Sequence, residues 1–394
     1  MPFDFPASPA TGTSVTTPGG SYTYDGTKWA AAPSSGLYMP LSGGTFTGPV
    51  TLAADPAAEL QPVTLQYEQA NAGAKNIGRN LLHNGLFNVQ QRGAGPWSTQ
   101  SYTADRWMSQ LATTGGSLSI TLAAVTASSA ASSFQDEACE YLLAIASGAG
   151  TGTSDFAILT QRVEDLRRLS GKTVIVSFWA ASQAGTPKIG VEMTMNFGTG
   201  GSPTGQWNGA SNSALQGQAV PLSTTWARHS VVVAMPSAAS ATFGTNAGTS
   251  FAELNLWISA GSGQNLRSGS IGQQTWNGYI WGVQLEIAQP GQTQPTPLEK
   301  PDPRYDLSNC QRFYQPAECN LGGYAGAGGV GFTYNIPFMV EMRASPTVSV
   351  GTTNYTNVGS VSFATSNHHT YCYSLSSGVG GFIFGAVLQL SADL

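Results

Sequence analysis

Residues 278–288, "GYIWGVQLEIA", are the clearest structural signal in this chain. Tyr279, Trp281, Val283, Leu285 and Ile287 occupy alternate positions, and Gly282, Gln284 and Glu286 lie between the last four. This pattern predicts a strand with the five side chains on one face. The same period of two recurs between residues 80 and 290. Examples are "KTVIVSFWAA" (172–181), "TWARHSVVVAM" (225–235) and "AELNLWIS" (252–259). Frequent strands separated by Gly- and Ser-rich loops predict an all-β, two-sheet sandwich of jelly-roll type.

One segment of this region has two interpretations. In "ILTQRVEDLRRLSG" (158–171), Leu159, Val163, Leu166 and Leu169 recur at helical spacing. The segment is equally compatible with a strand followed by a turn, and the pattern does not decide between them.

Two stretches flank the large β region. "SYTYDGTKW" (21–29) predicts a hairpin around Asp25-Gly26 that carries Tyr22, Tyr24 and Trp29. Because a lone hairpin is marginal in water, we expect these rings to pack on sister copies or on a docking partner. On the other side, "PGQTQPTPLEKPDPRYD" (290–306) contains five prolines and predicts a stiff linker. Beyond it the alternation resumes in a smaller β domain.

Residues 39–70, "MPLSGGTFTGPVTLAADPAAELQPVTLQYEQA", change from a Gly- and Thr-rich run to helical spacing. Leu60, Val63 and Tyr67 begin a two-position heptad pattern that is too short to stabilise an isolated coil. Three copies meeting along an axis would bury this narrow apolar stripe. We therefore expect a short helix in a trimeric stalk.

The sequence thus divides into five predicted segments. They are an N-terminal attachment segment (1–37), a trimeric stalk with a short helix (38–79), a carbohydrate-binding-module-like jelly-roll sandwich (80–290), a Pro-rich linker (291–306) and a C-terminal β tip (307–394).

The charge composition argues against nucleic acid as a partner. Only 9% of the residues are charged, the net charge is −5, and the 16 basic residues are scattered. Phosphate binding needs clustered Lys and Arg. No apolar run approaches the ~20 residues of a spanning helix, and the N-terminus lacks the features of a signal peptide. We therefore expect synthesis in a cytoplasm and no insertion into a membrane.

The reactive residues do not form a familiar catalytic or metal-binding pattern. The four cysteines lack metal-ligand spacing, so free thiols and no metal or cofactor are expected. Two acidic clusters, Asp136-Glu137 with Glu140 and Glu164-Asp165, are interpreted as solvated surface. The repeated short rungs of a β-helix are missing from the sequence, and the histidines lack a G-x-S-x-G partner. These patterns predict a protein that is not an enzyme.

Several aromatic residues are candidates for glycan binding, because sugars stack on flat rings while their hydroxyls bond to polar neighbours. Trp97, Trp207 and Trp276 are expected in polar, Gly-flanked loops. In the C-terminal domain the candidates are Tyr324, Tyr355 and the pair His368 and His369, the pair being also compatible with a metal contact.

Four stretches together resemble the trimeric tail fibres and spikes of tailed bacteriophages and phage-like particles. "FPASPATGTSVTTPGGSYTYDGTKW" is similar to the segment near the virion end, and "YMPLSGGTFTGPVTLAADPAAELQPVTLQYEQA" to the stalk motif. "NLLHNGLFNVQQRG", "SYTADRWM" and "IWGVQLEIA" resemble a carbohydrate-binding-module-like jelly roll. "SNCQRFYQ" and "IPFMVEMRASPTV" resemble the opening of a tip domain.

The resemblance implies a virion-borne homotrimer that is assembled in the bacterial cytoplasm and acts outside it. Its N-terminus would dock on a phage tail or capsid protein, and its outer domains would bind host-surface polysaccharide without chemistry. A head fibre, a polysaccharide-cleaving tailspike and a structural spacer are the alternatives. Related jelly rolls often hold calcium through acids, but the corresponding places here are Asn88 and Trp281-Gly282, so we expect no calcium site.

Overall fold

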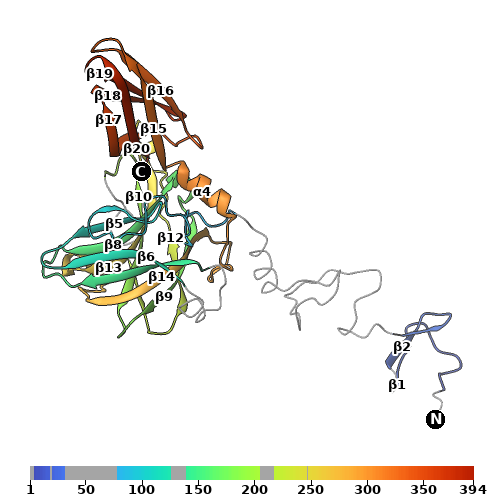
Figure 1. Cartoon of the computed structure of the whole chain (residues 1–394). Coiled ribbons are helices and arrows are strands. Elements are labelled where there is room, and N and C mark those ends of the chain that lie inside the picture. The colour runs from blue at the N-terminus through green and yellow to red at the C-terminus, as the bar shows by residue number, and fades with distance from the viewer. Residues whose placement is uncertain (1–3, 18–19, 32–77, 126–138, 205–216, 246) are drawn as a thin grey trace. The chain divides into compact units, whose positions relative to one another are not determined.

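The computed structural model describes residues 4–17, 20–31, 78–125, 139–204, 217–245 and 247–394 (Figure 1). It divides into two units, Met1–Tyr67 and Glu68–Leu394. The predicted stalk up to residue 77, with Leu60, Val63 and Tyr67, lies outside the described residues, and so does Trp207. Among the described helices, none is long and apolar enough to cross a membrane.

The N-terminal unit contains a three-stranded antiparallel sheet of β1 (Ser14–Thr17), β2 (Gly20–Tyr24) and β3 (Trp29–Ala31). The hairpin predicted around Asp25 is confirmed as β2–β3, and β1 is an additional strand. The Asp25 carboxylate accepts the backbone N–H groups of Thr27 and Lys28, at 2.8 and 2.9 Å, which stabilises the turn. Trp29 packs against Tyr24 and against Phe5, with ring centroids 5.5 and 4.9 Å apart.

The larger unit begins with a β-sandwich of two antiparallel sheets (Figure 1). The six-stranded sheet has the order β11 (Gln218–Pro221), β10 (Lys188–Asn196), β13 (Phe251–Ala260), β8 (Phe156–Glu164), β5 (Met108–Ala112) and β4 (Ser101–Tyr102). The five-stranded sheet has the order β12 (Ala227–Ala234), β9 (Thr173–Ser182), β14 (Trp276–Ile287), β7 (Tyr141–Gly148) and β6 (Ser117–Ala124).

The core of this sandwich follows the alternation seen in the sequence. Val174, Val176 and Phe178 of β9 and Leu254 and Leu256 of β13 are fully buried between the two sheets. The ambiguous segment is a strand: β8 ends at Glu164, and a 3-10 turn η1 (Leu166–Arg168) follows. Two further short helical elements, η2 (Ala247–Thr249) and η3 (Ser262–Gln264), and the one-turn helix α3 (Asn265–Ser268) lie in connections.

The strand predicted from residues 278–288 is confirmed as β14, but its five apolar side chains do not share one face. The register with β9 shifts between Trp281 and Gln284, and Gly282 has a φ of 61°. Such a β-bulge inserts one residue and reverses the alternation beyond it. Ile280 and Val283 therefore both enter the core, while Tyr279 pairs with Ala144 on the opposite face.

The C-terminal sandwich, called the tip below, is smaller. One sheet has the order β15 (Tyr314–Ala325), β20 (Gly380–Ser391) and β17 (Thr347–Thr356). The other has the order β16 (Gly331–Pro337), β19 (His369–Ser376) and β18 (Val358–Thr365). Phe382, Phe384 and Leu388 of β20 and Cys319 and Cys372 fill the space between the sheets.

The Pro-rich segment is bound to the large sandwich rather than extended between domains. Thr296 donates its N–H and its hydroxyl to the Glu286 carboxylate of β14, both at 2.7 Å. The predicted boundary at 306/307 falls inside helix α4 (Pro303–Gln311), which the alternation did not reveal. Asp302 caps this helix by accepting the Arg304 N–H at 2.8 Å, and Pro303 occupies its first turn.

Charged side chains join the tip to the large sandwich. Glu164 of β8 accepts from Arg312 at 2.9 Å and from Arg343 at 3.1 Å. Arg92 pairs with Asp393, and its guanidinium lies 3.7 Å from the centre of the Tyr314 ring. These ion pairs and the cation–π contact of Arg92 join the two sandwiches.

Candidate functional site

A row of outward side chains follows the central strand of one tip sheet. His369, Tyr371, Tyr373 and Leu375 alternate along β19 with residues that are at most 4% exposed, among them Cys372. Tyr373 is 43% exposed and Leu375 45%, while His369 and Tyr371 are half-buried. Strand alternation places these four side chains on the solvent side and the intervening ones in the core.

Small polar side chains flank the row on both sides. By register, Tyr373 lies between Thr333 of β16 and Ser362 of β18, and Tyr371 pairs with Asn335 of β16. The three strands contain no Lys, Arg, Asp or Glu. The aromatic row therefore stands in an uncharged frame of hydroxyls and an amide.

The rings lie close enough to form one continuous surface. The His369 and Tyr371 centroids are 4.6 Å apart with an interplanar angle of 77°, and those of Tyr371 and Tyr373 are 6.1 Å apart at 36°. Rings offer apolar faces, and their hydroxyls and the flanking side chains offer hydrogen bonds. This combination suits a flat, uncharged, hydroxyl-rich ligand. We call His369, Tyr371, Tyr373 and Leu375 the β19 row.

The tip residues proposed from the sequence occupy different places. Only His369 belongs to the β19 row. Tyr324, 72% exposed, lies on β15, and Tyr355, 64% exposed, lies on β17, both in the other sheet. His368 is in the loop before β19, with its Nε2 3.7 Å from Glu341 Oε1. The predicted residues are thus scattered over the tip and do not form one surface.

The sequence analysis missed Tyr371 and Tyr373. The signal was present in "HHTYCYSLSS" (368–377), where three ring-bearing residues occur at alternate positions. Applying the period of two to this stretch would have placed both tyrosines beside His369.

The tryptophans proposed from the sequence do not form an exposed platform. Trp276 was expected in a polar loop, but it begins β14, is 5% exposed and donates its indole N–H to the Ile258 carbonyl at 3.1 Å. That expectation is wrong because the Gly-flanked stretch is already part of the sheet. Trp97 is half-buried, packs against the core and pairs with Ile120 in an isolated bridge.

A second aromatic group lies on the outward face of the five-stranded sheet. The rings of Trp226 and Tyr279 are stacked, with centroids 6.0 Å apart at 17°. Gln183 Nε2 donates to the Tyr279 hydroxyl at 2.7 Å, and Arg228 donates to Ser177 Oγ at 3.0 Å. Both rings are half-buried, and the bulge at Gly282 is what turns Tyr279 to this face.

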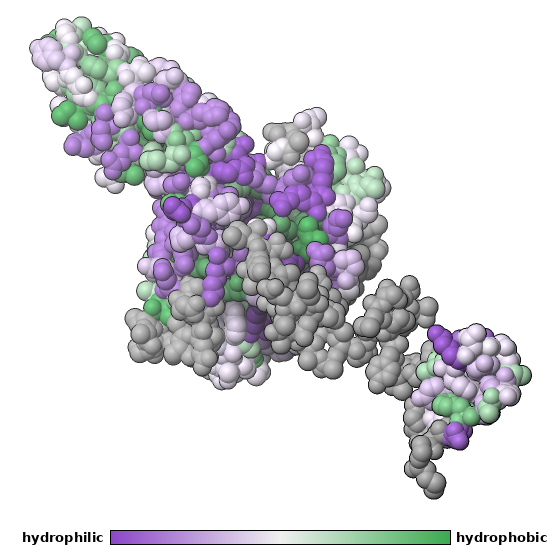
Figure 2. Space-filling view, turned by 90° about the vertical axis from the view of Figure 1, so that its right-hand side faces the viewer, coloured by the Kyte–Doolittle hydropathy of each residue, from purple (hydrophilic) through white to green (hydrophobic). Residues whose placement is uncertain are grey.

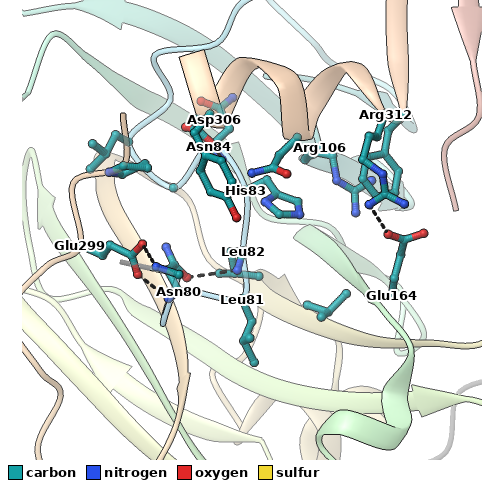
Figure 3. Close-up of a pocket in the computed structure, with 18 of the residues that line it drawn as sticks. Asn80, Leu81, Leu82, His83, Asn84, Arg106, Glu164, Glu299, Asp306 and Arg312 are labelled. Carbon is teal, nitrogen blue, oxygen red and sulfur yellow. Dashed lines mark hydrogen bonds and ion pairs between the residues drawn. The ribbon is translucent and has the colours of Figure 1, made fainter. Parts of the chain in front are cut away.

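A cavity of about 190 Å³ lies where the chain entering the large sandwich meets β8 and α4 (Figure 3). Its lining includes His83, Arg106, Arg312 and Glu164. Burial lowers the pKa of His83 to about 3, and the guanidinium groups of Arg106 and Arg312 act in the same direction. The imidazole is therefore neutral at pH 7.

The acids that line this cavity are all held by protein donors. Glu299 accepts the backbone N–H groups of Gly78 and Asn80, at 2.5 and 2.7 Å, and Asp306 accepts the Asn84 N–H at 2.8 Å (Figure 3). Burial raises the pKa of Asp306. Since Glu164 is bound by two arginines, the cavity is organised as a structural junction.

Buried acids elsewhere are also tied to neighbours. The Glu192 carboxylate accepts from Arg267 Nε at 2.8 Å and from Trp257 Nε1 at 3.1 Å, while burial raises the pKa of this group. Asp105 accepts the N–H of Gln91 at 2.7 Å, and burial raises its pKa to about 6. Among the described residues, no three His, Cys, Asp or Glu side chains are grouped as metal ligands.

No protein-family model and no curated protein matches this sequence. Among solved structures, the enzymatically active domain of bacteriophage CBA120 tailspike protein 4 aligns at 14% identity over 53% of this chain and 22% of that chain, with a TM-score of 0.31. The aligned part thus spans less than a quarter of the tailspike chain. A family 11 carbohydrate-binding module from Clostridium thermocellum, in complex with a β-1,3-1,4-mixed-linked tetrasaccharide, aligns at 10% identity over 46% and 89%, with a TM-score of 0.28.

TmCBM61, in complex with β-1,4-galactotriose, aligns at 14% identity over 54% of this chain and all of that module (100%), with a TM-score of 0.28. The likeness to the tailspike domain and to the carbohydrate-binding modules is one of β-sandwich fold at low sequence identity.

Proposed function

We propose that this chain is an adhesive fibre protein of a phage or phage-like particle that binds neutral host-surface glycans through the β19 row of its tip. The binding is not accompanied by bond cleavage. The protein acts as a homotrimer, is assembled in the bacterial cytoplasm and works outside it as part of the virion.

The β19 row is the observation that carries this proposal. It presents two tyrosines and a histidine in an uncharged frame, with Tyr373 flanked by the hydroxyls of Thr333 and Ser362. An anionic polysaccharide would find no Lys or Arg side chain on these three strands. The proposed ligand class is therefore a neutral oligosaccharide.

The state of the acids supports a role without catalysis. Glycoside hydrolysis uses two carboxylates, one as acid and one as base or nucleophile, on either side of the scissile bond. Glu192, Glu253 and Asp306, three of the buried acids, accept hydrogen bonds from protein donors. Groups held in this way serve the fold.

A trimer supports adhesion because single sugar sites are weak. Three parallel tips on one fibre gain about 10²- to 10⁴-fold in avidity without any new contact. In the N-terminal unit, Tyr22, Tyr24 and Trp29 form an aromatic cluster with Phe5, which suits docking on a tail or capsid protein. Head or tail mounting would leave the tip chemistry unchanged.

The stacked pair of Trp226 and Tyr279 makes the large sandwich a second candidate for the glycan site. The hydroxyl of Tyr279 is already bonded to Gln183, and Arg228 lies on the same face. The β19 row is favoured because Tyr373 is 43% exposed, its strands carry no Lys, Arg, Asp or Glu, and small hydroxyls flank it.

The test is an array of neutral and acidic oligosaccharides probed with the full chain. Tyr371→Ala with Tyr373→Ala removes two rings, each contributing about 1 kcal/mol, so affinity should fall by about tenfold or more. Tyr324→Ala is the control, because it removes an exposed tyrosine ring from the other sheet of the same domain. The proposed site would be refuted if the control lost binding, or if the double variant bound as well as the wild type.

Two further results would refute the function itself. Reducing ends released from host polysaccharide would show a hydrolase. A well-folded trimer that binds neither the array nor the cells recognised by its parent particle would show a structural spacer.

A further inference from the structure

The tip sandwich is open along one side. Its two sheets end there in β17 and β18, which each pair with one neighbour only and are separated in sequence by the single residue Asn357. Nine of the ten residues of β17 are exposed, and only Val348 is half-buried. An edge strand with a covered inner face would alternate instead.

The exposed residues include side chains that face the core. Val350 pairs with Leu388, and Tyr355 pairs with Phe384, so each shares the inward face of the sheet with its partner. The partners are 0% and 3% exposed, whereas Val350 is 45% and Tyr355 64% exposed. The core of the tip is therefore uncovered where it reaches β17. In Figure 2, hydrophobic residues lie at the surface of the tip, which is the lobe at the top of the picture.

This side lacks two of the features that keep edge strands apart, charge and proline, although β17 is irregular between Val350 and Thr353 and β18 between Val358 and Ser360. Natural edges are guarded by charges, prolines or bulges, since their free N–H and C=O groups otherwise pair with another chain. Residues 347–365 contain no charged residue and no proline. The opposite side of the same sandwich is guarded by Pro316 and Glu318 on β15 and by Pro337 on β16.

We propose that the side formed by β17 and β18 is where the tip of one copy of this chain docks on another copy. The lack of charge on this side indicates that its partner is a second copy of the chain. The surface is neutral over 19 consecutive residues (347–365), so two identical surfaces meet without like-charge repulsion and match hydroxyl to hydroxyl and apolar to apolar. A charged partner would leave its own charges unpaired there.

Docking of a second copy would also cover what is now exposed. Val350 and Tyr355 would leave water, and the free backbone groups of β17 would gain partners. The inference extends the proposed trimer and depends on it only for the number of copies. It does not involve the β19 row, which lies on the outward face of the other sheet.

The test is amide hydrogen exchange on the full chain, because a stalk could hold copies together whatever the tips do. We expect peptides within 347–365 to exchange slowly in the wild type. Tyr355→Lys introduces a charge at the open side and should accelerate their exchange by at least about tenfold. Tyr324→Lys is the matched control, the same change on the guarded side, and should leave these rates unchanged.

Exchange of β20 peptides reports whether each variant is folded. The result for Tyr355→Lys is used only if exchange of the β20 peptides is the same as in the wild type. If this variant unfolds, Val350→Lys replaces it under the same criterion. Edge peptides that exchange in the wild type as fast as those of β15 would overturn the inference, as would a folded variant without acceleration. Glycan-array binding, measured on the same samples, reports separately on the proposed function.

Discussion

The large sandwich and the tip differ in how completely each closes its core. β13 of the large sandwich is buried along all ten residues, whereas β17 of the tip has nine exposed residues of ten. Ten of the fourteen exposed large hydrophobic side chains in the described parts of the chain lie between residues 314 and 394. The large sandwich buries its core within one chain, whereas the tip leaves apolar surface exposed and available for contacts with other molecules.

The largest expected effect comes from breaking the closed core. Phe178→Ala should cost about 3–5 kcal/mol, because the side chain is fully buried and the cavity cannot collapse. Tyr324→Ala at the tip should change the free energy of unfolding by no more than about 0.5 kcal/mol. Urea denaturation of the full chain measures both. Similar losses in the two variants would contradict the contrast between the sandwiches.

A smaller effect is expected from removing the Glu164 ion pairs that join the two sandwiches. Glu164→Gln leaves Arg312 and Arg343 without their carboxylate and should cost about 2–3 kcal/mol. Calorimetry should then show the tip and the large sandwich unfolding in separate transitions. The control is Asp302→Asn, whose pair with Arg304 is exposed and should matter little. A single unchanged transition for Glu164→Gln would show that these ion pairs do not couple the unfolding of the two sandwiches.

The effect that is smallest near neutral pH, and that grows on acidification, is a pH dependence at the same junction. The folded chain keeps His83 neutral down to a pKa of about 3, whereas the unfolded chain binds this proton below pH 6.5. The stability contributed by neutral His83 is therefore complete above pH 6.5 and lost on acidification, by up to about 1.4 kcal/mol per pH unit. His83→Gln should flatten this part of the profile.

Asp105 provides the opposite sign as a control. Its pKa is raised to about 6 in the folded chain, so the folded state binds a proton that the unfolded state has released. Asp105→Asn should therefore remove a gain in stability that appears as the pH falls from 6 towards 4. Chemical denaturation at several pH values measures both slopes, and identical slopes in the two variants would contradict the assignment.

Strand faces were predictable where alternation was uninterrupted. Val174 and Val176, and likewise Leu254 and Leu256, lie in the core as their spacing indicated. The bulge at Gly282 was not predictable, because one inserted residue changes the face of Tyr279 without changing the composition of the strand.

Contacts between distant segments were also beyond the sequence. Asp105 and Arg106 are neighbours in the sequence, yet Asp105 binds Gln91, and Arg106 reaches Asp393 at 3.7 Å. A charge selects its partner by tertiary proximity, which spacing along the chain does not encode. The β19 row, by contrast, was readable from its period of two.

The most direct measurement of the glycan site is hydroxyl-radical footprinting of the full chain with a neutral oligosaccharide that binds on the array. The account predicts that oxidation of Tyr371 and Tyr373 falls on binding, while Trp226, Tyr279 and Tyr324 react as before. Protection of Trp226 and Tyr279 with unchanged Tyr373 would place recognition on the large sandwich and contradict the account.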